Sequence, residues 1–290
     1  MPCVDGEDGG RRDRLVRLRA EVGALHQQAV QASTTRHWDE GRRRLREAVL
    51  ADDPGQLLTW PVIRDTMLVA GDRHPYLAAE LAALQKDAGW EQRWRPACSD
   101  EIGAPPPLPG LPGGSGNRLH HAYQFLQLER AGAGRVQDYG HLVEFGAGYG
   151  AMCAVAHRLG FGGSYLLFDL PEWSALQRWY LGEVGLLDDT GRVRTASDED
   201  GLREEVARAD EGSLLVAMWS LSETPLELRE RILPGGERFG GYLFGYQATF
   251  EGIDNLAWFA QLQRDRPDVE WTGGEPEAAS GNRYLVGRRR

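Results

Sequence analysis

Apolar and polar positions change their pattern near residue 140. From there to the C-terminus, short apolar runs that predict strands alternate with stretches of helical spacing. The runs occupy residues 142–145, 165–168, 193–196, 214–219, 241–246, 269–272 and 283–286. The helical patterns occupy residues 152–159, 171–185, 199–209, 226–233 and 253–264. This alternation predicts an α/β fold with a mostly parallel sheet.

The last two apolar runs depart from the alternation, because only a loop rich in Gly, Glu, Pro and Ser separates them. We therefore expect them to form an antiparallel hairpin. The predicted architecture is a seven-stranded Rossmann-like sheet, mostly parallel, that a C-terminal antiparallel hairpin completes. A dinucleotide-binding domain would instead have six parallel strands and no closing hairpin.

The first third of the chain carries helical spacing and no strand pattern. Helices are predicted over residues 14–30, 38–50, 57–69 and 76–89. Segments rich in Gly and Asp lack the apolar surface to fold, and Pro/Gly-rich segments make semi-extended linkers. The sequence thus predicts a disordered tail (1–12), an N-terminal helical domain (13–103), a Pro/Gly linker (104–114) and a second domain (115–290). An exposed apolar face on the N-terminal helices would support a homodimer.

Composition excludes several classes of protein. No apolar run approaches the length that spans a membrane, and the N-terminus lacks the apolar segment of a signal peptide. Three scattered cysteines indicate neither a disulfide framework nor a zinc cluster. The formal net charge of −10 argues against a nucleic acid as the main partner, since such binding uses clustered Lys and Arg. We expect a cytoplasmic protein without a metal site, a membrane or a nucleic-acid partner.

The most informative stretch follows the first apolar run, which breaks into Gly146-Ala147-Gly148-Tyr149-Gly150 before a helix. Glycines let a backbone turn sharply and approach a ligand, and a helix N-terminus offers free N–H groups. The second run ends on Asp169, where a carboxylate can accept hydrogen bonds from ribose hydroxyls. A glycine turn and an acid in this arrangement predict a nucleoside-containing cofactor.

Two cofactors fit this turn. Gly146-x-Gly148-x-x-Ala151 satisfies the dinucleotide pattern, which would indicate a nicotinamide cofactor. S-adenosylmethionine is favoured by Glu144, which can fix the turn and the amino group of a methionine moiety. The position of the turn, halfway along the chain, and the terminal hairpin also favour it.

The chemistry is expected where the strands end, because ligands of open α/β sheets lie beyond the carboxyl ends of the strands. Candidate cofactor-binding residues are Glu144, Gly146, Ala147, Gly148, Asp169, Leu170, Ser197 and Trp219. Candidate acceptor contacts are Tyr123, Ser222, Tyr246 and Gln247. Methyl transfer to a hydroxyl needs a base within reach of the acceptor oxygen. Glu223 is the candidate that the topology places best. His120 and His121 are candidates because the usual pKa of imidazole suits a base near neutral pH, so these three residues stay open.

Several segments together resemble the sugar O-methyltransferases of bacterial polysaccharide and natural-product gene clusters, a family of class I S-adenosylmethionine-dependent methyltransferases. The segments are LHHAYQFLQLE (119–129), VEFGAGYG (143–150), FDLPEWSALQRWYL (168–181), SLSETP (220–225) and GYQ (245–247). The resemblance covers residues 115–260. It implies that Glu144, Gly146, Gly148 and Asp169 bind S-adenosylmethionine and that Ser222-Glu223 faces the acceptor. The chain departs from the family in Phe145-Gly146-Ala147, where Ile-Gly-Gly is common, and in Trp219.

The resemblance thus implies methyl transfer to a hydroxyl of a small molecule, such as a sugar or glycosylated natural product, with S-adenosylhomocysteine as the second product. Methylation of a nitrogen or carbon of a non-sugar metabolite would use the same cofactor site. A nicotinamide-dependent oxidoreductase and an inactive methyltransferase-like subunit are the remaining hypotheses. The N-terminal helical region lies outside the resemblance, so the acceptor stays open.

Overall fold

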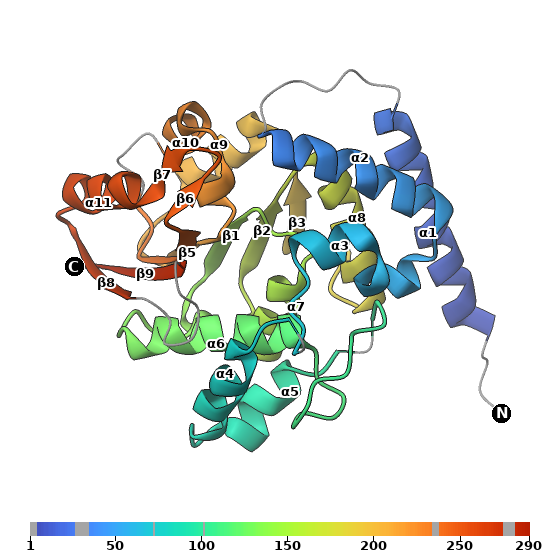
Figure 1. The fold of residues 1–290 in the computed structure, drawn as a ribbon, viewed down its shortest axis with the longest axis horizontal. Helices are drawn as coiled ribbons and strands as arrows, with labels where there is room; N and C mark the ends of the chain where they lie inside the picture. Colours follow the sequence, from blue (N-terminus) through green and yellow to red (C-terminus); the bar gives the residue numbers. More distant parts are fainter. Residues whose placement is uncertain (1–4, 27–34, 72, 101, 234–237, 275–281) are drawn as a thin grey trace.

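A seven-stranded sheet lies at the centre of the molecule (Figure 1). The computed structural model describes residues 5–26, 35–71, 73–100, 102–233, 238–274 and 282–290. The sheet has the order β3-β2-β1-β4-β5-β9-β8. Its strands are β1 (His141–Phe145), β2 (Ser164–Phe168), β3 (Val193–Ala196), β4 (Ser213–Met218), β5 (Gly241–Gln247), β8 (Val269–Gly274) and β9 (Asn282–Arg289). The first five pair in parallel, and β9 pairs antiparallel with β5 and β8. The predicted fold class is confirmed.

Helices cover both faces of the sheet. One face carries α6 (Gly116–Arg130), α7 (Ala151–Arg158) and α8 (Pro171–Glu183), and the other carries α9 (Glu199–Arg208), α10 (Leu226–Ile232) and α11 (Asn255–Asp265). Successive strand side chains point to opposite faces, so Leu142 packs with the first set and Val143 with the second. A small hairpin of β6 (Thr249–Phe250) and β7 (Ile253–Asp254) precedes α11, which therefore begins two residues later than predicted.

The N-terminal third is helical, as predicted. Its elements are α1 (Asp5–His26), α2 (Arg36–Ala51), η1 (Pro54–Thr59), α3 (Pro61–Thr66), α4 (Tyr76–Gln85), η2 (Trp90–Trp94) and α5 (Arg95–Ala97). In Figure 1, α1, α2 and α3 lie on the right near α8, and α4 and α5 lie at the bottom, below α6. Two short 3₁₀ turns, η3 (Val136–Asp138) and η4 (Leu221–Glu223), complete the elements of the described residues.

Two expectations for this third are wrong. The tail predicted to be disordered over residues 1–12 is helical from Asp5 onward, while residues 1–4 lie outside the described residues. Helix α1 continues ahead of its apolar pattern because Arg11 and Arg14 both pair with Glu183 of α8, at 3.5 and 2.7 Å. The single helix predicted over 57–69 is broken by Pro61, which has no N–H to donate and keeps Trp60 extended.

A buried ion-pair cluster fastens α2 to α8. Glu172 is fully buried, and its carboxylate oxygens lie 2.8 Å from Arg42 Nε and 2.5 Å from Arg46 Nη1. Removing one partner of a buried pair leaves an uncompensated charge, which costs far more than an exposed pair contributes. The cluster therefore specifies where the N-terminal helices sit on the sheet layer.

The stretch 104–114 does not interrupt the packing. Leu108 and Leu111 within it are buried, and the same hydrophobic cluster contains Leu18 of α1 and Val286 of β9. The predicted division into two domains is therefore not visible as a break in the core of the described residues. None of the helices within those residues is long and apolar enough to cross a bilayer.

Candidate active site

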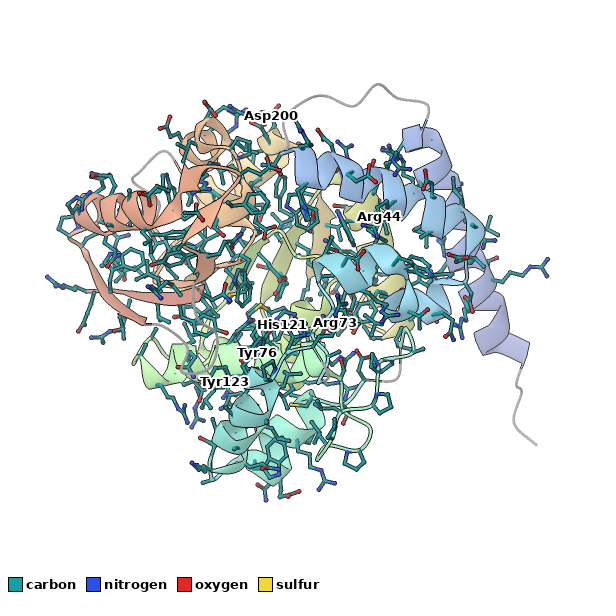
Figure 2. All side chains as sticks on the ribbon, in the orientation of Figure 1. Arg44, Arg73, Tyr76, His121, Tyr123 and Asp200 are labelled. Carbon is teal, nitrogen blue, oxygen red and sulfur yellow. The ribbon has the colours of Figure 1, made fainter. Side chains whose placement is uncertain are left out.

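A cavity of about 680 Å³ opens at the carboxyl ends of β1, β2 and β4. Its volume lies within the range of about 300–1,000 Å³ that is usual for small-molecule sites. The sheet edge supplies one wall, and residues 35–76 of the N-terminal third supply the other. Figure 2 labels Arg73, Tyr76 and His121, which line this cavity from the N-terminal third and from α6.

The glycine turn after β1 forms the floor of the cavity. Gly146, Gly148 and Gly150 all have positive φ, at 73°, 57° and 98°. Side chains rarely adopt this conformation, so the turn needs glycine at these positions. At Gly146 there is also no room, because an added Cβ would lie 2.1 Å from the Ser220 Cβ. The β4 loop thus packs directly on the turn, and the Ser220 hydroxyl donates to the Phe145 carbonyl.

Asp169 faces the glycine turn from the end of β2. Its Oδ2 accepts a hydrogen bond from the Gly148 N–H at 2.7 Å, and its Oδ1 accepts one from the Leu170 N–H at 2.7 Å. Burial raises the pKa of this carboxyl to about 7, although both backbone N–H groups lower it. Gln177 of α8 steadies the turn from the other side by donating to the Gly148 carbonyl at 2.8 Å.

Glu144 lies in β1, two residues before the turn, and its side chain lines the cavity. The Tyr165 hydroxyl donates to Glu144 Oε2 at 2.7 Å. Burial raises the pKa of Glu144 to about 8, and the nearby Asp169 adds to the effect. No cation pairs with either carboxylate among the described residues. The floor of the cavity therefore holds two carboxyl groups whose ionised forms are poorly compensated.

Glu223 lines the cavity from η4, next to the N-terminal third. Trp38 Nε1–H of α2 donates to its Oε2 at 2.9 Å, and Gln247 Nε2–H donates to its Oε1 at 3.1 Å. Burial raises the pKa of Glu223 to about 7. The two donors hold the carboxyl group in one orientation.

Both candidate histidines line the cavity from the first turns of α6. His120 Nδ1 lies 2.9 Å from each carboxylate oxygen of Glu80, which the sequence did not identify. The His120 ring stacks on Trp219. His121 Nδ1 contacts Gln124 Oε1 at 2.9 Å, and burial lowers the pKa of His121 to about 4.

The cavity brings together most of the predicted site residues. Those that line it are Glu144, Gly146, Ala147, Gly148, Asp169, Leu170, Ser197, Trp219, Glu223, His120 and His121. The four predicted acceptor contacts do not line the cavity. Ser222 is fully buried and donates to Gln247 Oε1 at 2.7 Å, and Gln247 in turn donates to Glu223, so both residues hold Glu223 in position. Tyr246 stacks on Phe259 in the core, and Tyr123 packs near Tyr284.

The sequence did not predict the second wall of the cavity, which residues 35–76 supply and which we call the N-terminal wall. Met67 lies over the turn, with its Sδ 3.3 Å from where a Gly148 Cβ would be. Asn117 of α6 holds that segment by donating to the Met67 carbonyl at 2.7 Å and accepting from the Val69 N–H at 3.0 Å. Thr35 and Trp173 also line the cavity, and their Oγ1 and Nε1 atoms are buried without a hydrogen-bond partner within the described residues.

The raised pKa values predict an unusual pH dependence of stability. Glu144, Asp169 and Glu223 titrate near 4 when unfolded and near 7–8 when folded, so the folded protein holds more protons between these values. The free energy of unfolding without ligand should then fall as pH rises from about 6.5 to 8.5, by on the order of 3 kcal/mol. Urea titrations at both pH values measure it. Glu144→Gln should flatten the slope, and an unchanged slope would contradict this assignment.

Among the described residues, no group of three or more His, Cys, Asp or Glu side chains could hold a metal ion. No protein-family model and no curated protein sequence matches the chain. The predicted resemblance to sugar O-methyltransferases therefore stays a prediction.

Several solved structures to which the chain is similar are described as methyltransferases. A precorrin-6y C5,15-methyltransferase from Geobacter metallireducens has 14% identity and a TM-score of 0.36 over 57% of this chain and 88% of that one. An O-methyltransferase family protein from Burkholderia thailandensis has 13% identity and a TM-score of 0.39 over 59% and 60%. An rRNA methylase from Streptococcus thermophilus has 15% identity and a TM-score of 0.41 over 59% and 95%. These proteins differ in what they methylate, and their likeness to this chain is low.

Proposed function

We propose that the cavity binds S-adenosylmethionine and that the protein transfers its methyl group to a hydroxyl of a small molecule. The observation that carries this proposal is the pair of carboxylates on the cavity floor. Asp169 is fixed against the glycine turn, where it can accept from ribose hydroxyls, and Glu144 is placed for an ammonium group. A cationic ligand would supply the positive charge that both carboxylates lack.

The charge of the cavity distinguishes this ligand from a nicotinamide dinucleotide. A dinucleotide places its pyrophosphate against the glycine turn. An acid in the position of Asp169 suits the ribose of either cofactor, so Glu144 is the residue that separates the two. Its carboxyl group lies beside the turn, where a negative charge would oppose a pyrophosphate. S-adenosylmethionine instead carries a sulfonium and an ammonium group, which suit this floor.

The shape of the other wall supports a small acceptor. The rings of His74 and Tyr76 make a T-shaped contact with centroids 5.4 Å apart, and the Tyr76 ring lies 5.3 Å from that of His120. Aromatic faces of this kind stack on sugar rings and flat rings. Residues 35–76 enclose the cavity, which limits the acceptor to a molecule that fits beside the donor. We therefore propose a ring-bearing hydroxyl compound, with a sugar or glycosylated natural product as the class that the resemblance implies.

Cofactor binding provides the first test. S-adenosylhomocysteine at 100 times its Kd should stabilise the protein by about 2.7 kcal/mol, seen as a higher Tm. Reduced nicotinamide dinucleotides should leave Tm unchanged. The opposite pattern would favour an oxidoreductase, and no shift with either nucleoside would favour an inactive methyltransferase-like subunit.

Product analysis provides the second test. The protein is incubated with S-adenosylmethionine carrying a deuterated methyl group and a panel of hydroxyl metabolites, and products are identified by mass spectrometry. Label on oxygen supports the proposal. Label only on nitrogen or carbon would replace the O-methyltransferase assignment with the alternative methylation.

A further inference from the structure

A buried Glu–His pair lies where α4 and α6 meet, in the wall of the cavity. Glu80 of α4 and His120 of α6 are 5% and 4% exposed. His120 Nδ1 lies 2.9 Å from both carboxylate oxygens, so a proton on Nδ1 is shared with a buried carboxylate. The imidazole then presents Nε2 as the free ring nitrogen, since no group among the described residues bonds to it. His120 itself lines the cavity.

Two aromatic rings hold the imidazole in place. The Trp219 ring stacks on it with centroids 5.3 Å apart and planes 25° apart, and Tyr76 lies at 5.3 Å. Trp219 has a left-handed backbone (φ 63°) directly after β4, and its Nε1–H donates to Asn282 Oδ1 at 2.9 Å. This strained conformation turns the indole toward His120 and places the pair at the same sheet edge as Gly146.

We propose that Glu80 and His120 form the proton-accepting dyad of the reaction, with His120 as the catalytic base and Glu80 as its positioning residue. This inference rests on the proposed methyl transfer. Bound S-adenosylmethionine supplies an electrophilic methyl group on sulfur. The acceptor oxygen forms the new C–O bond as the C–S bond breaks and its electron pair stays on sulfur. The hydroxyl proton moves to His120 Nε2, and the Glu80 carboxylate stabilises the resulting imidazolium.

The other two base candidates are less suited. Burial lowers the pKa of His121 to about 4, so it takes up a proton poorly near neutral pH. Trp38 and Gln247 each donate to one oxygen of Glu223, and these two bonds fix the carboxyl group toward α2 and β5. Each oxygen keeps a second lone pair, so Glu223 is disfavoured by this orientation, whereas Nε2 of His120 lies in a cavity-lining residue and has no partner among the described residues.

A pH test of the dyad must separate it from the other titratable groups of the cavity. Those facing the dyad are Tyr76 of α4, Tyr284 of β9 and His121 of α6. Burial raises the pKa of both tyrosines well above neutral and lowers that of His121 to about 4, so these three keep one protonation state between about pH 6 and 9. Glu144, Asp169 and Glu223 line the same cavity with pKa values of about 7 to 8, so the dyad is reported by the difference between the wild-type and Glu80→Gln profiles and not by the wild-type profile alone.

The first experiment needs no acceptor. Nitrogen-15 NMR of histidine-labelled protein reports which ring nitrogen carries the proton, and His120→Gln assigns the signal. We expect His120 to be protonated on Nδ1 with a bare Nε2 in the wild type, and to lose this preference in Glu80→Leu. A proton on Nε2 in the wild type would overturn the proposal, because that nitrogen could not act as a base.

The second experiment measures release of S-adenosylhomocysteine with a panel of phenols and monosaccharides. Glu80→Gln and His120→Gln should reduce kcat by roughly 10²–10⁴-fold, the usual contribution of a base, while binding of S-adenosylhomocysteine by calorimetry stays within about twofold. Glu80→Gln should also move the acid side of the pH–rate profile to lower pH, which loss of folding would not do. An unchanged kcat and profile would overturn the dyad.

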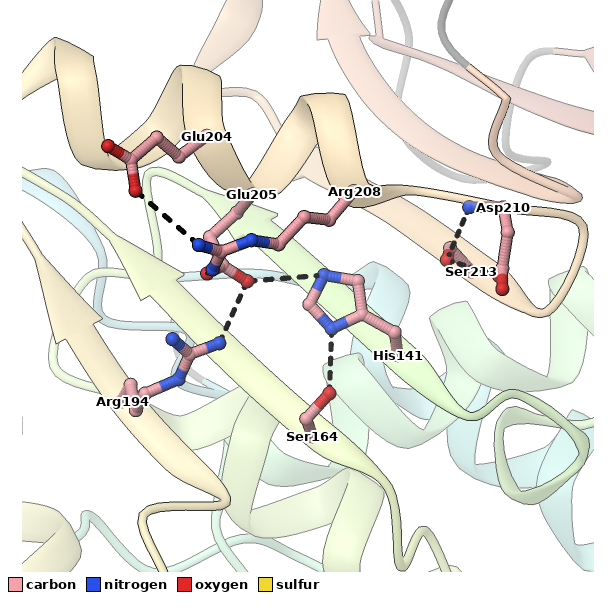
Figure 3. A network of polar contacts seen from close by, with 8 residues as sticks. All are labelled: His141, Ser164, Arg194, Glu204, Glu205, Arg208, Asp210 and Ser213. Carbon is pink, nitrogen blue, oxygen red and sulfur yellow. Dashed lines mark hydrogen bonds and ion pairs between the residues drawn. The ribbon is translucent and has the colours of Figure 1, made fainter.

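His141 and Glu205 provide a matched control at the opposite end of β1 (Figure 3). His141 Nε2 lies 3.6 Å from Glu205 Oε2, and Glu205 is as buried as Glu80, whereas the His141 side chain is 15% exposed. Neither residue lines the cavity. Glu205→Gln should leave kcat and its pH profile unchanged. Equal losses in Glu205→Gln and Glu80→Gln would mean that Glu80 acts only through folding. Failure of the wild type to bind S-adenosylhomocysteine would instead refute the proposed function, whatever the NMR result.

Discussion

Replacing Gly146 with alanine is expected to destabilise the protein by about 2–5 kcal/mol and to abolish cofactor binding. A side chain at positive φ costs about 1–2 kcal/mol, and overpacking a tight contact typically costs a further 1–3 kcal/mol. The added Cβ would lie 2.1 Å from the Ser220 Cβ, so the β4 loop must move away from the turn. Urea unfolding and calorimetry with S-adenosylhomocysteine measure both effects.

Gly132 offers a matched control for this change. It has the same φ of 73°, but an added Cβ there meets nothing within 4 Å. Gly132→Ala should therefore lower the free energy of unfolding by only about 1–2 kcal/mol, the cost of a side chain at positive φ, and leave cofactor binding intact. If both variants lose the same stability, the close approach of the β4 loop contributes nothing, and our explanation of the turn is wrong.

Replacing Asp169 with asparagine should weaken S-adenosylhomocysteine binding roughly 100-fold. A hydrogen bond to a charged group is worth about 1.5–3 kcal/mol, and the carboxylate is placed to accept from two ribose hydroxyls. The asparagine retains the shape of the side chain, but its NH2 group cannot accept from one of the two N–H groups, of Gly148 and Leu170, that the carboxylate binds. Urea unfolding of the variant therefore accompanies the binding measurement, to separate loss of the turn from loss of the ribose contact. Isothermal titration calorimetry measures the change in Kd.

Asp254 supplies the corresponding control. It also accepts from a backbone N–H, that of Ala257 at 3.0 Å, but it caps α11 outside the cavity. Asp254→Asn should not alter Kd. Equal affinity of wild type and Asp169→Asn would remove the ribose assignment and, with it, the main support for a nucleoside ligand.

Local patterns predicted the sheet well. Each of the seven predicted strands forms, because buried strands need continuous apolar runs and the turns between them are marked by Gly and polar residues. The glycine turn and Asp169 were also predictable, since their backbone and position at a strand end impose specific residue types. The residues at the sheet edge of the cavity therefore lie in short segments whose local pattern is visible in the sequence.

The N-terminal wall could not be predicted in the same way. Trp38 contacts Glu223 at a separation of 185 residues in the sequence, and Glu80 contacts His120 at a separation of 40 residues. The helical spacing of α2 and α4 does not distinguish Trp38 and Glu80 from ordinary core or surface residues. Ser222 and Gln247 were read as acceptor contacts because they follow strands. They bond to each other behind Glu223 instead, since a strand-end residue can point toward or away from the cavity.

The Glu172 cluster fixes α2 against α8 through a single carboxylate. Under the proposed function, a 35–76 segment of different sequence that retained Arg42 and Arg46 is expected to change the preferred acceptor, while the residues at the sheet edge continue to bind the donor. Substrate range would then be set by one short segment of the chain.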